Sequence, residues 1–140
     1  MNETSQSPNM GISMKAVVFN TEGEMLTLFR TETAPTRPNT WDLPGGDLDF
    51  GEDPNTAITR EIEEETGLNV TDLKIFDVEA HIIKEENIHW VTLGYRCVAL
   101  STEVVLSEEH NAYKWVTKEE FLSLESGPKL QRFVRNSVNK

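Results

Sequence analysis

The chain has 140 residues, a length that suits one domain and leaves little room for a second. Its hydrophobic share of 37% and charged share of 26% are those of a globular protein, and no apolar run approaches the roughly 20 residues that span a bilayer. The formal net charge of −11 argues against polynucleotide binding, because proteins that follow a nucleic-acid backbone neutralise phosphates with clustered Lys and Arg. If the ligand is nevertheless a phosphate compound, cations must offset its repulsion from the acidic protein.

The start of the chain and its single cysteine indicate the cellular compartment in which the protein is expected. Residues 1–10, MNETSQSPNM, lack the basic and apolar regions of a signal peptide, so we expect a disordered tail over residues 1–11 and a single domain over residues 12–140. Cys97 is the only cysteine and lies in an apolar run, which excludes an intrachain disulfide and predicts a core position. These features favour a soluble protein of the reducing cytoplasm, without a membrane partner.

The domain is expected to open with a β-hairpin and a long loop. Residues 12–20 and 25–30 are rich in β-forming side chains, and the segment between them contains Gly23. Residues 31–40 are polar and hold two prolines, which predicts a loop of the kind that often carries binding residues.

Residues typical of helix ends mark the two limits of a helix after this loop. Residues 41–43 are expected to be extended before a proline, and the pair Gly45-Gly46 predicts a turn. Asp53 suits the N-cap, a proline follows it at the first helical position, and Gly67 suits the residue just beyond the last turn. The helix is therefore predicted over residues 54–66.

The second half of the chain mixes strands and helices. Residues 69–84 and 88–100 predict two long paired strands, and residues 112–116 predict another. A capping box predicts a helix over residues 117–124, and apolar spacing predicts a last helix over residues 129–138. The chain therefore belongs to the α/β class, with a central mixed β-sheet flanked by helices.

Three glutamates gather on one face of the predicted helix 54–66. Glu61, Glu64 and Glu65 are spaced i, i+3 and i+4, so their side chains project in similar directions. Acidic helix faces are usually solvated surface, but like charges at i, i+4 and acids near a helix C-terminus both destabilise a helix. Mg²⁺ or Mn²⁺ would cancel this repulsion and leave positions for water and phosphate oxygens. The pattern therefore predicts a metal site.

A calcium-binding loop is the alternative that the nearby aspartates suggest. Asp47, Asp49 and Asp53 lie close together before the helix. Counting Asp47 as the first ligand places Glu52 at the required glycine and Ile58 at the required bidentate glutamate. The spacing excludes such a loop.

Residues 46–68, GDLDFGEDPNTAITREIEEETGL, resemble the Nudix box, written G-x5-E-x7-R-E-U-x-E-E-x-G-U with U aliphatic. The segment 41–45, WDLPG, is also similar to the usual approach to this box. All constrained positions match, namely Gly46, Glu52, Arg60, Glu61, Ile62, Glu64, Glu65, Gly67 and Leu68. The resemblance implies a Nudix hydrolase with that family's α/β/α sandwich.

The resemblance also implies roles for the residues of the box. Glu61, Glu64 and Glu65 match the family's metal ligands, and Glu52 matches a glutamate that supports or joins the metal shell. Arg60 matches the arginine that orients these glutamates, which agrees with the ability of a guanidinium to hold a carboxylate in one geometry.

The same resemblance suggests candidate site residues outside the box. Family members often supply a further carboxylate from the loop before a late strand that carries a tryptophan, and here Glu109 is the candidate, with Glu108 as the alternative. Arg30 stands where related enzymes often place a basic residue against substrate, and Gly45 and Gly46 are further predicted substrate contacts.

The histidines and tryptophans are expected to be structural. The histidines show no spacing typical of metal ligands, so they are interpreted as ordinary strand or loop residues (His81, His89 and His110). The tryptophans could stack on a base, but core packing is favoured for each (Trp41, Trp90 and Trp115).

The resemblance implies hydrolysis of a phosphoanhydride bond by water activated on two or three Mg²⁺ ions, with Mn²⁺ as the alternative. Glu64 or Glu109 would accept the proton of the water, and Arg60 would assist. The family acts on nucleoside diphosphate derivatives and on nucleoside triphosphates. Residues 84–86 replace the proline of ADP-ribose hydrolases and the tyrosine of dinucleoside polyphosphate hydrolases, which favours a triphosphate cleaved to monophosphate and pyrophosphate.

Several alternatives stay open at this point. The substrate could be a nucleotide sugar or an ADP-ribose type compound. The domain could instead be a non-catalytic nucleotide sensor, although the complete box disfavours this, or an acidic interaction module, which leaves the Gly and Arg positions unexplained. A small-molecule nucleotide is thus the expected partner, and a homodimer is possible because such dimers are common in the family.

Overall fold

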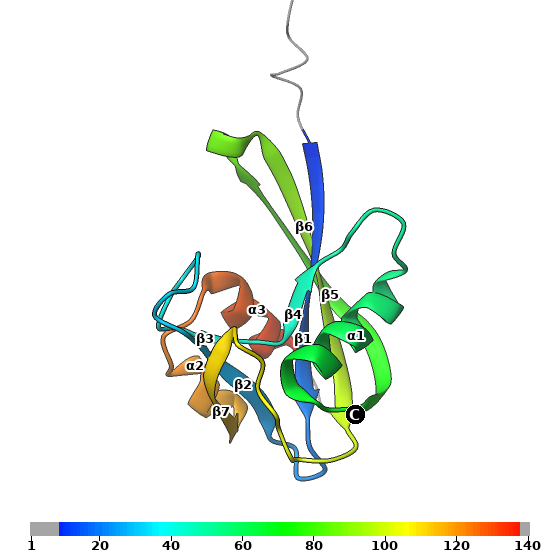
Figure 1. Ribbon diagram of the computed structural model, residues 1–140, viewed down its shortest axis with the longest axis vertical. Coiled ribbons are helices and arrows are strands. Elements are labelled where there is room, and N and C mark those ends of the chain that lie inside the picture. Colours follow the sequence, from blue (N-terminus) through cyan, green and yellow to red (C-terminus); the bar gives the residue numbers. More distant parts are fainter. Residues whose placement is uncertain (1–8, 138–140) are drawn as a thin grey trace, which may run out of the picture.

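The computed structural model describes residues 9–137, and within them seven strands form one mixed sheet (Figure 1). The strand order is β3-β2-β1-β6-β5, with β4 paired to β1 and β7 paired to β2. The strands are β1 (Asn9–Phe19), β2 (Met25–Arg30), β3 (Trp41–Asp42), β4 (Gly45–Asp47), β5 (Val70–Ile83), β6 (Ile88–Ala99) and β7 (His110–Val116). The helices are α1 (Pro54–Thr66), α2 (Lys118–Leu122) and α3 (Pro128–Asn136), with a 3₁₀ turn η2 (Lys84–Glu86) between β5 and β6.

Helices cover both faces of the sheet, which confirms the predicted α/β/α sandwich. Because side chains alternate along a strand, Met14, Ala16 and Val18 of β1 pack in a core cluster with α1, and Val17 and Phe19 pack in another with α2 and α3. Figure 1 shows α1 on one side of β1 and the two other helices across it. None of the described helices is long and apolar enough to cross a membrane.

The central strand β1 begins earlier than expected. Asn9 pairs in parallel with Ile88, and this pairing continues along β6 to the end of the strand. Residues 9–11 are therefore strand and not part of the predicted tail. Their own sequence has no strand pattern, but β6 lies beside them and provides partners for their backbone hydrogen bonds. The rest of the predicted tail lies outside the described residues. The expected hairpin to β2 exists, but its register is a single pair, Phe19 with Met25.

The pair Gly45-Gly46 was predicted to form a turn, and this is wrong. Both residues lie in β4, which runs antiparallel to β1 and pairs with Ser13, Met14 and Lys15. A Cβ on Gly45 would overlap the carbonyl oxygen of Met14. Glycine is needed here for the close approach of two backbones, not for a positive φ.

Helix α1 has the predicted limits. Asp53 caps it by accepting from the Thr56 N–H, and Gly67 ends it with a left-handed φ of 73°. Ile58 and Ile62 are buried and fix the helix on the sheet, so the acidic positions are held at the edge of the core.

The later elements differ from expectation mainly at their ends. The two long strands β5 and β6 pair antiparallel as predicted, and β7 begins at His110, two residues before the expected start. The predicted capping box of α2 is present, although the helix ends at Leu122. The last helix begins at Pro128 and ends at Asn136, and the predicted end at Val138 lies outside the described residues. Cys97 is buried, as predicted.

Candidate metal and substrate site

A cavity of about 560 Å³ opens at the edge of the sheet where α1, β4 and the start of β7 meet. Acidic side chains from α1 and from the segment before β7 line one part of it, and basic side chains line another. A neighbouring cavity of about 320 Å³ continues toward the start of α3. The two cavities share Lys15, Arg30, Asp42, His81 and Lys129. Together they form one continuous cleft with an acidic end and a basic end.

The acidic end is built on the last two turns of α1. Glu65 is only 5% exposed and accepts the Gly45 N–H at 3.3 Å. Burial raises the pKa of Glu65 to about 8, against the opposing charge of Lys15 and with added repulsion from Glu109 and Glu61. A buried carboxylate surrounded by other carboxylates is stable as an anion only when a cation accompanies it.

Glu61 lies beside Glu65 over the second glycine of β4. Burial raises the pKa of Glu61, and the charges of Glu64 and Glu109 add to this rise while Arg60 opposes it. A Cβ on Gly46 would lie 2.8 Å from the carboxyl carbon of Glu61. The two glycines therefore line the cleft and leave room for the carboxylates, and their contact with substrate stays a prediction.

Glu109, just before β7, and His110, the first residue of β7, add to the acidic end. Ligand atoms of Glu65, Glu109 and His110 lie within 4.8 Å of one another, with Glu65 and His110 buried and Glu109 exposed. Glu108, the alternative carboxylate, is absent from this cluster and lines neither cavity. A buried anion, an accessible carboxylate and an imidazole make a donor set that fits a divalent cation.

The other charged residues of the motif, Glu52, Arg60 and Glu64, lie toward solvent. Arg60 donates to Glu52 at 2.8 Å and to Glu64 at 3.2 Å, and it lies 3.7 Å from Glu61. Glu52 also accepts the Asp49 N–H at 2.8 Å. The arginine thus pairs with three glutamates, and its role in orienting metal ligands stays a prediction. The side chain of Glu64 is 59% exposed and, like Glu52, lines neither cavity, so metal ligation by these two residues stays a prediction.

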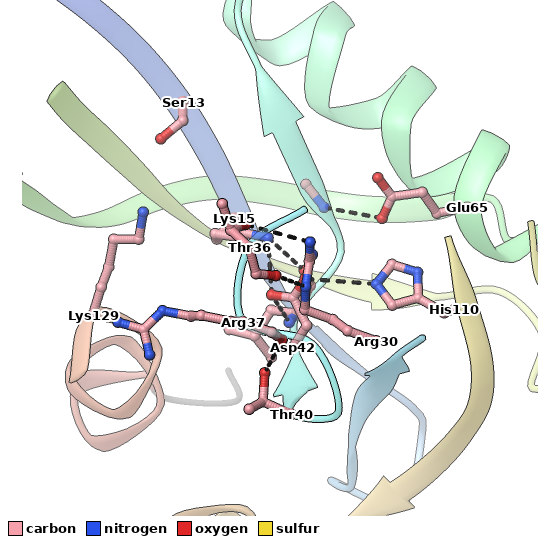
Figure 2. Close-up of polar contacts among 12 residues, drawn as sticks. Ser13, Lys15, Arg30, Thr36, Arg37, Thr40, Asp42, Glu65, His110 and Lys129 are labelled. Atoms are coloured by element: carbon pink, nitrogen blue, oxygen red, sulfur yellow. Dashed lines mark hydrogen bonds and ion pairs between the residues drawn. The ribbon is translucent and has the colours of Figure 1, made fainter. Parts of the chain in front are cut away.

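Asp42 lies at the junction between the acidic and the basic ends of the cleft (Figure 2). It pairs with Lys15 at 2.9 Å and with Arg30 at 2.9 Å, and its Oδ2 lies 3.5 Å from Nε2 of His110. Burial alone would raise the pKa of Asp42, but the charge of Lys15 and the surrounding donors outweigh burial and hold the pKa well below its usual range. Arg30 lines the cleft and is further fixed by a bond to the Thr36 carbonyl at 2.9 Å, and its contact with substrate stays a prediction.

Sequence reasoning did not assign several charged cleft residues to the site, among them Lys15, Asp42, His110 and Lys129. Lys15 lies between buried apolar neighbours on β1, and a charged side chain in such a run was the signal that could have found it. Lys129, at the start of α3, donates to Thr92 at 3.1 Å, and burial followed by the charge of Lys15 lowers the pKa of its amine. Asp42 lies in the segment that resembles the approach to the box, but only the fold pairs it with Lys15 and Arg30. His110 was interpreted as an ordinary strand or loop residue, and only the fold places it near Glu65 and Glu109.

The tryptophans divide between core and cleft. Trp115 packs against the cluster under α1, as predicted. Trp41 packs partly against the other cluster but also lines the smaller cavity, and Trp90 lines the larger one. Core packing is therefore only part of the role of Trp41.

Comparisons with known proteins agree with this architecture. The NUDIX domain profile matches residues 10–136. The chain is 31% identical to a MutT-like protein from Streptomyces ambofaciens, over 84% of this chain and 71% of the relative, and 32% identical to the nucleoside triphosphatase NudI of Escherichia coli, over 61% of this chain and 67% of the relative. The structure of a MutT protein from Methanosarcina mazei superposes with a TM-score of 0.77 at 30% identity, covering 92% of this chain and 93% of that one. A MutT Nudix hydrolase from Burkholderia pseudomallei superposes with a TM-score of 0.78 at 27% identity, covering 93% and 99%. With a domain match across almost all described residues and every constrained position of the box in place, this chain belongs to the Nudix family of pyrophosphohydrolases.

Proposed function

We propose that this enzyme hydrolyses a nucleoside triphosphate to a monophosphate and pyrophosphate, with Mg²⁺ or Mn²⁺ as cofactor. The observation that carries the proposal is the single cleft in which a cluster of carboxylates faces a set of cationic side chains. The name nucleoside triphosphatase of one relative supports the same substrate class.

The basic end of the cleft suits a chain of phosphates. Lys15, Arg30 and Lys129 line both cavities, and Arg37 lines the smaller one. Lys15 and Arg30 share the single carboxylate of Asp42, so two cations are balanced by one anion there. The surplus positive charge would bind phosphate oxygens that the net charge of −11 otherwise repels.

The smaller cavity would hold the nucleoside. The indole ring of Trp41 forms part of its wall. The ring centroids of Trp41 and Phe29 lie 4.9 Å apart, and this contact holds the indole in a fixed orientation. The cavity lies beyond the shared cations, so a nucleoside there would direct its phosphates toward the acidic end. Its volume of about 320 Å³ falls at the lower end of ordinary ligand sites.

The acidic end would hold the cofactor. Glu61, Glu65 and Glu109 are the proposed oxygen ligands, and a divalent ion bound there would supply a Lewis acid for the phosphates and lower the pKa of a water. Gly45 orients the carboxylate of Glu65, and Arg60 restrains Glu61. Of the two candidate bases, Glu109 is in the cleft and accessible, whereas Glu64 is directed at Arg60, so we assign proton acceptance to Glu109.

A panel of nucleotides tests this proposal. Ribo- and deoxynucleoside triphosphates, nucleotide sugars and ADP-ribose would be incubated with Mg²⁺, and phosphate would be measured with and without inorganic pyrophosphatase. We expect phosphate from the triphosphates only when pyrophosphatase is present. The Glu109→Gln variant should reduce kcat about 100-fold or more, whereas Glu108→Gln, one residue away and outside the cleft, should retain it.

Other outcomes would replace the proposal. Cleavage of ADP-ribose or a nucleotide sugar, without cleavage of any triphosphate, would identify the alternative substrate class. Tight binding of one nucleotide without hydrolysis of any compound would identify a sensor.

A further inference from the structure

His110 is a buried side chain whose ring nitrogens make no hydrogen bond within the described residues, although Nε2 lies 3.5 Å from Oδ2 of Asp42. Only 2% of the side chain is exposed, and neither Nδ1 nor Nε2 makes a hydrogen bond within residues 9–137. A buried ring nitrogen that lacks a partner destabilises the folded state by the full cost of its desolvation, about 1–3 kcal/mol. Such a residue calls for a ligand that is bound when the protein works.

The fold aims this side chain at the carboxylates of the cleft. His110 is the first residue of β7 and pairs with Arg30 of β2, just past an irregularity in the register between Phe29 and Arg30. Irregularities of this kind redirect side chains at the ends of strands. A ring nitrogen of His110 consequently lies within 4.8 Å of ligand atoms of both Glu65 and Glu109.

Asp42 lies on the other side of the imidazole. Its Oδ2 is 3.5 Å from Nε2, and Figure 2 shows His110 next to Asp42 and below Glu65. Asp42 is itself fixed by Lys15 and Arg30, so it cannot swing away to leave the ring unsupported. A carboxylate behind a histidine is the usual arrangement around metal-binding imidazoles, where it orients the ring and increases its basicity.

We propose that His110 is a nitrogen ligand of the divalent cation held by Glu65 and Glu109, and that this site therefore binds Mn²⁺ more tightly than Mg²⁺. The inference rests on the proposed metal-dependent function and adds a ligand that the Nudix box does not contain. Mg²⁺ is a hard cation that takes oxygen ligands almost exclusively, whereas the first-row transition metals, of which Mn²⁺ is the hardest, also accept an imidazole nitrogen beside carboxylates. Asp42 acts as a positioning residue for the ring.

A spectroscopic experiment tests the ligand directly and needs no substrate. The full chain would be loaded with one equivalent of Mn²⁺ alone, and pulsed electron paramagnetic resonance would be used to detect nuclear modulation from nitrogen. We expect a ¹⁴N modulation that changes to the ¹⁵N pattern when the chain is labelled with ¹⁵N-histidine. The labelled wild-type protein gives a decisive answer even if a substitution at position 110 impairs folding.

Two variants extend the test. His110→Gln should abolish the modulation and weaken Mn²⁺ binding in calorimetry at least tenfold, since even supporting residues of metal sites contribute about that much. Mg²⁺ binding should change by a smaller factor. His89→Gln is the matched control, because His89 is on β6, outside both cavities and outside the cluster. Circular dichroism would confirm that both variants fold.

The outcomes separate this inference from the proposed function. Triphosphate hydrolysis without histidine modulation of bound Mn²⁺ would overturn ligation by His110 and leave the hydrolase intact. Histidine modulation that disappears in His110→Gln, together with no hydrolysis of any nucleotide, would support the ligand and overturn the function. Equal affinity of the wild-type protein for Mn²⁺ and Mg²⁺ would overturn the proposed preference.

Discussion

Gly45 and Gly46 are adjacent, yet each leaves room for a different kind of neighbour. A Cβ on Gly45 would meet the backbone of β1, which cannot move without disturbing the sheet, whereas a Cβ on Gly46 would meet the end of the Glu61 side chain, which can rotate. We predict that Gly45→Ala lowers the free energy of unfolding by about 1–3 kcal/mol, as other overpacked positions do. Gly46→Ala should leave stability nearly unchanged but weaken Mn²⁺ or Mg²⁺ binding. Urea unfolding and calorimetry on the pair check this, and equal losses of stability in both variants would contradict it.

Individual side chains differ in how far the sequence reveals them. The carboxylates of α1 were predictable, because helical spacing and the motif place Glu61 and Glu65 on one helix face. The role of His110 was not predictable, because it depends on the proximity of Glu65, which lies far away in sequence and on another element. Local patterns predict which residues share an element, but they do not predict which elements meet.

The same distinction holds for whole elements. Helix α1 was predicted to the residue because its signals, Asp53 and Gly67, are local to its ends. The start of β1 and the strand β4 were missed because a strand also depends on its partner. Residues 9–11 are strand only because β6 lies beside them, and Gly45 is strand only because β1 does.

A carboxylate of β5 binds two side chains of helix α3, and this predicts a pH dependence. Asp77 binds Arg132 through two bonds of 3.0 and 3.1 Å and accepts from Asn136 at 2.9 Å. The hydrogen bond from Arg132 is the main reason that the pKa of Asp77 is lowered from its ordinary 3.8. Because the folded pKa lies below the unfolded one, the stabilisation is present above about pH 4 and is lost as pH falls through the folded pKa. Asp77→Asn should therefore be less stable than wild type at pH 7, and the difference should shrink toward pH 3.

Urea unfolding of both proteins at several pH values measures this difference. Asp72→Asn is the matched control, since Asp72 is exposed on the same strand and adopts a positive φ that asparagine tolerates. A stability difference between wild type and Asp77→Asn that stays constant from pH 7 to pH 3 would show that Arg132 gains nothing from the charge of Asp77.

At the scale of the molecule, the cleft reconciles an acidic surface with an anionic substrate. The net charge of −11 repels phosphates, but the cations of the cleft and the proposed metal ions would invert the field at the proposed substrate site. Composition alone predicted that cations must intervene, and the motif indicated the metal. The lysines could not be placed in advance, because Lys15 and Lys129 meet only when β1 and α3 pack together.

Cys97 makes the opening of the whole molecule measurable. It is the only cysteine, it is fully buried in the cluster that joins β1, β6 and α1, and burial raises the pKa of its thiol to about 12. Because only an exposed thiolate reacts, a slow thiol reagent should modify the native protein in proportion to the small equilibrium population of unfolded molecules. A ligand at 100 times its dissociation constant stabilises the folded state by about 2.7 kcal/mol, so Mn²⁺ at that excess should slow modification about 100-fold. NaCl at the same ionic strength is the control and should have little effect on the rate of modification. Fast modification of the native protein that does not change with Mn²⁺ would show that the reagent reaches Cys97 through a local opening that does not involve the metal site.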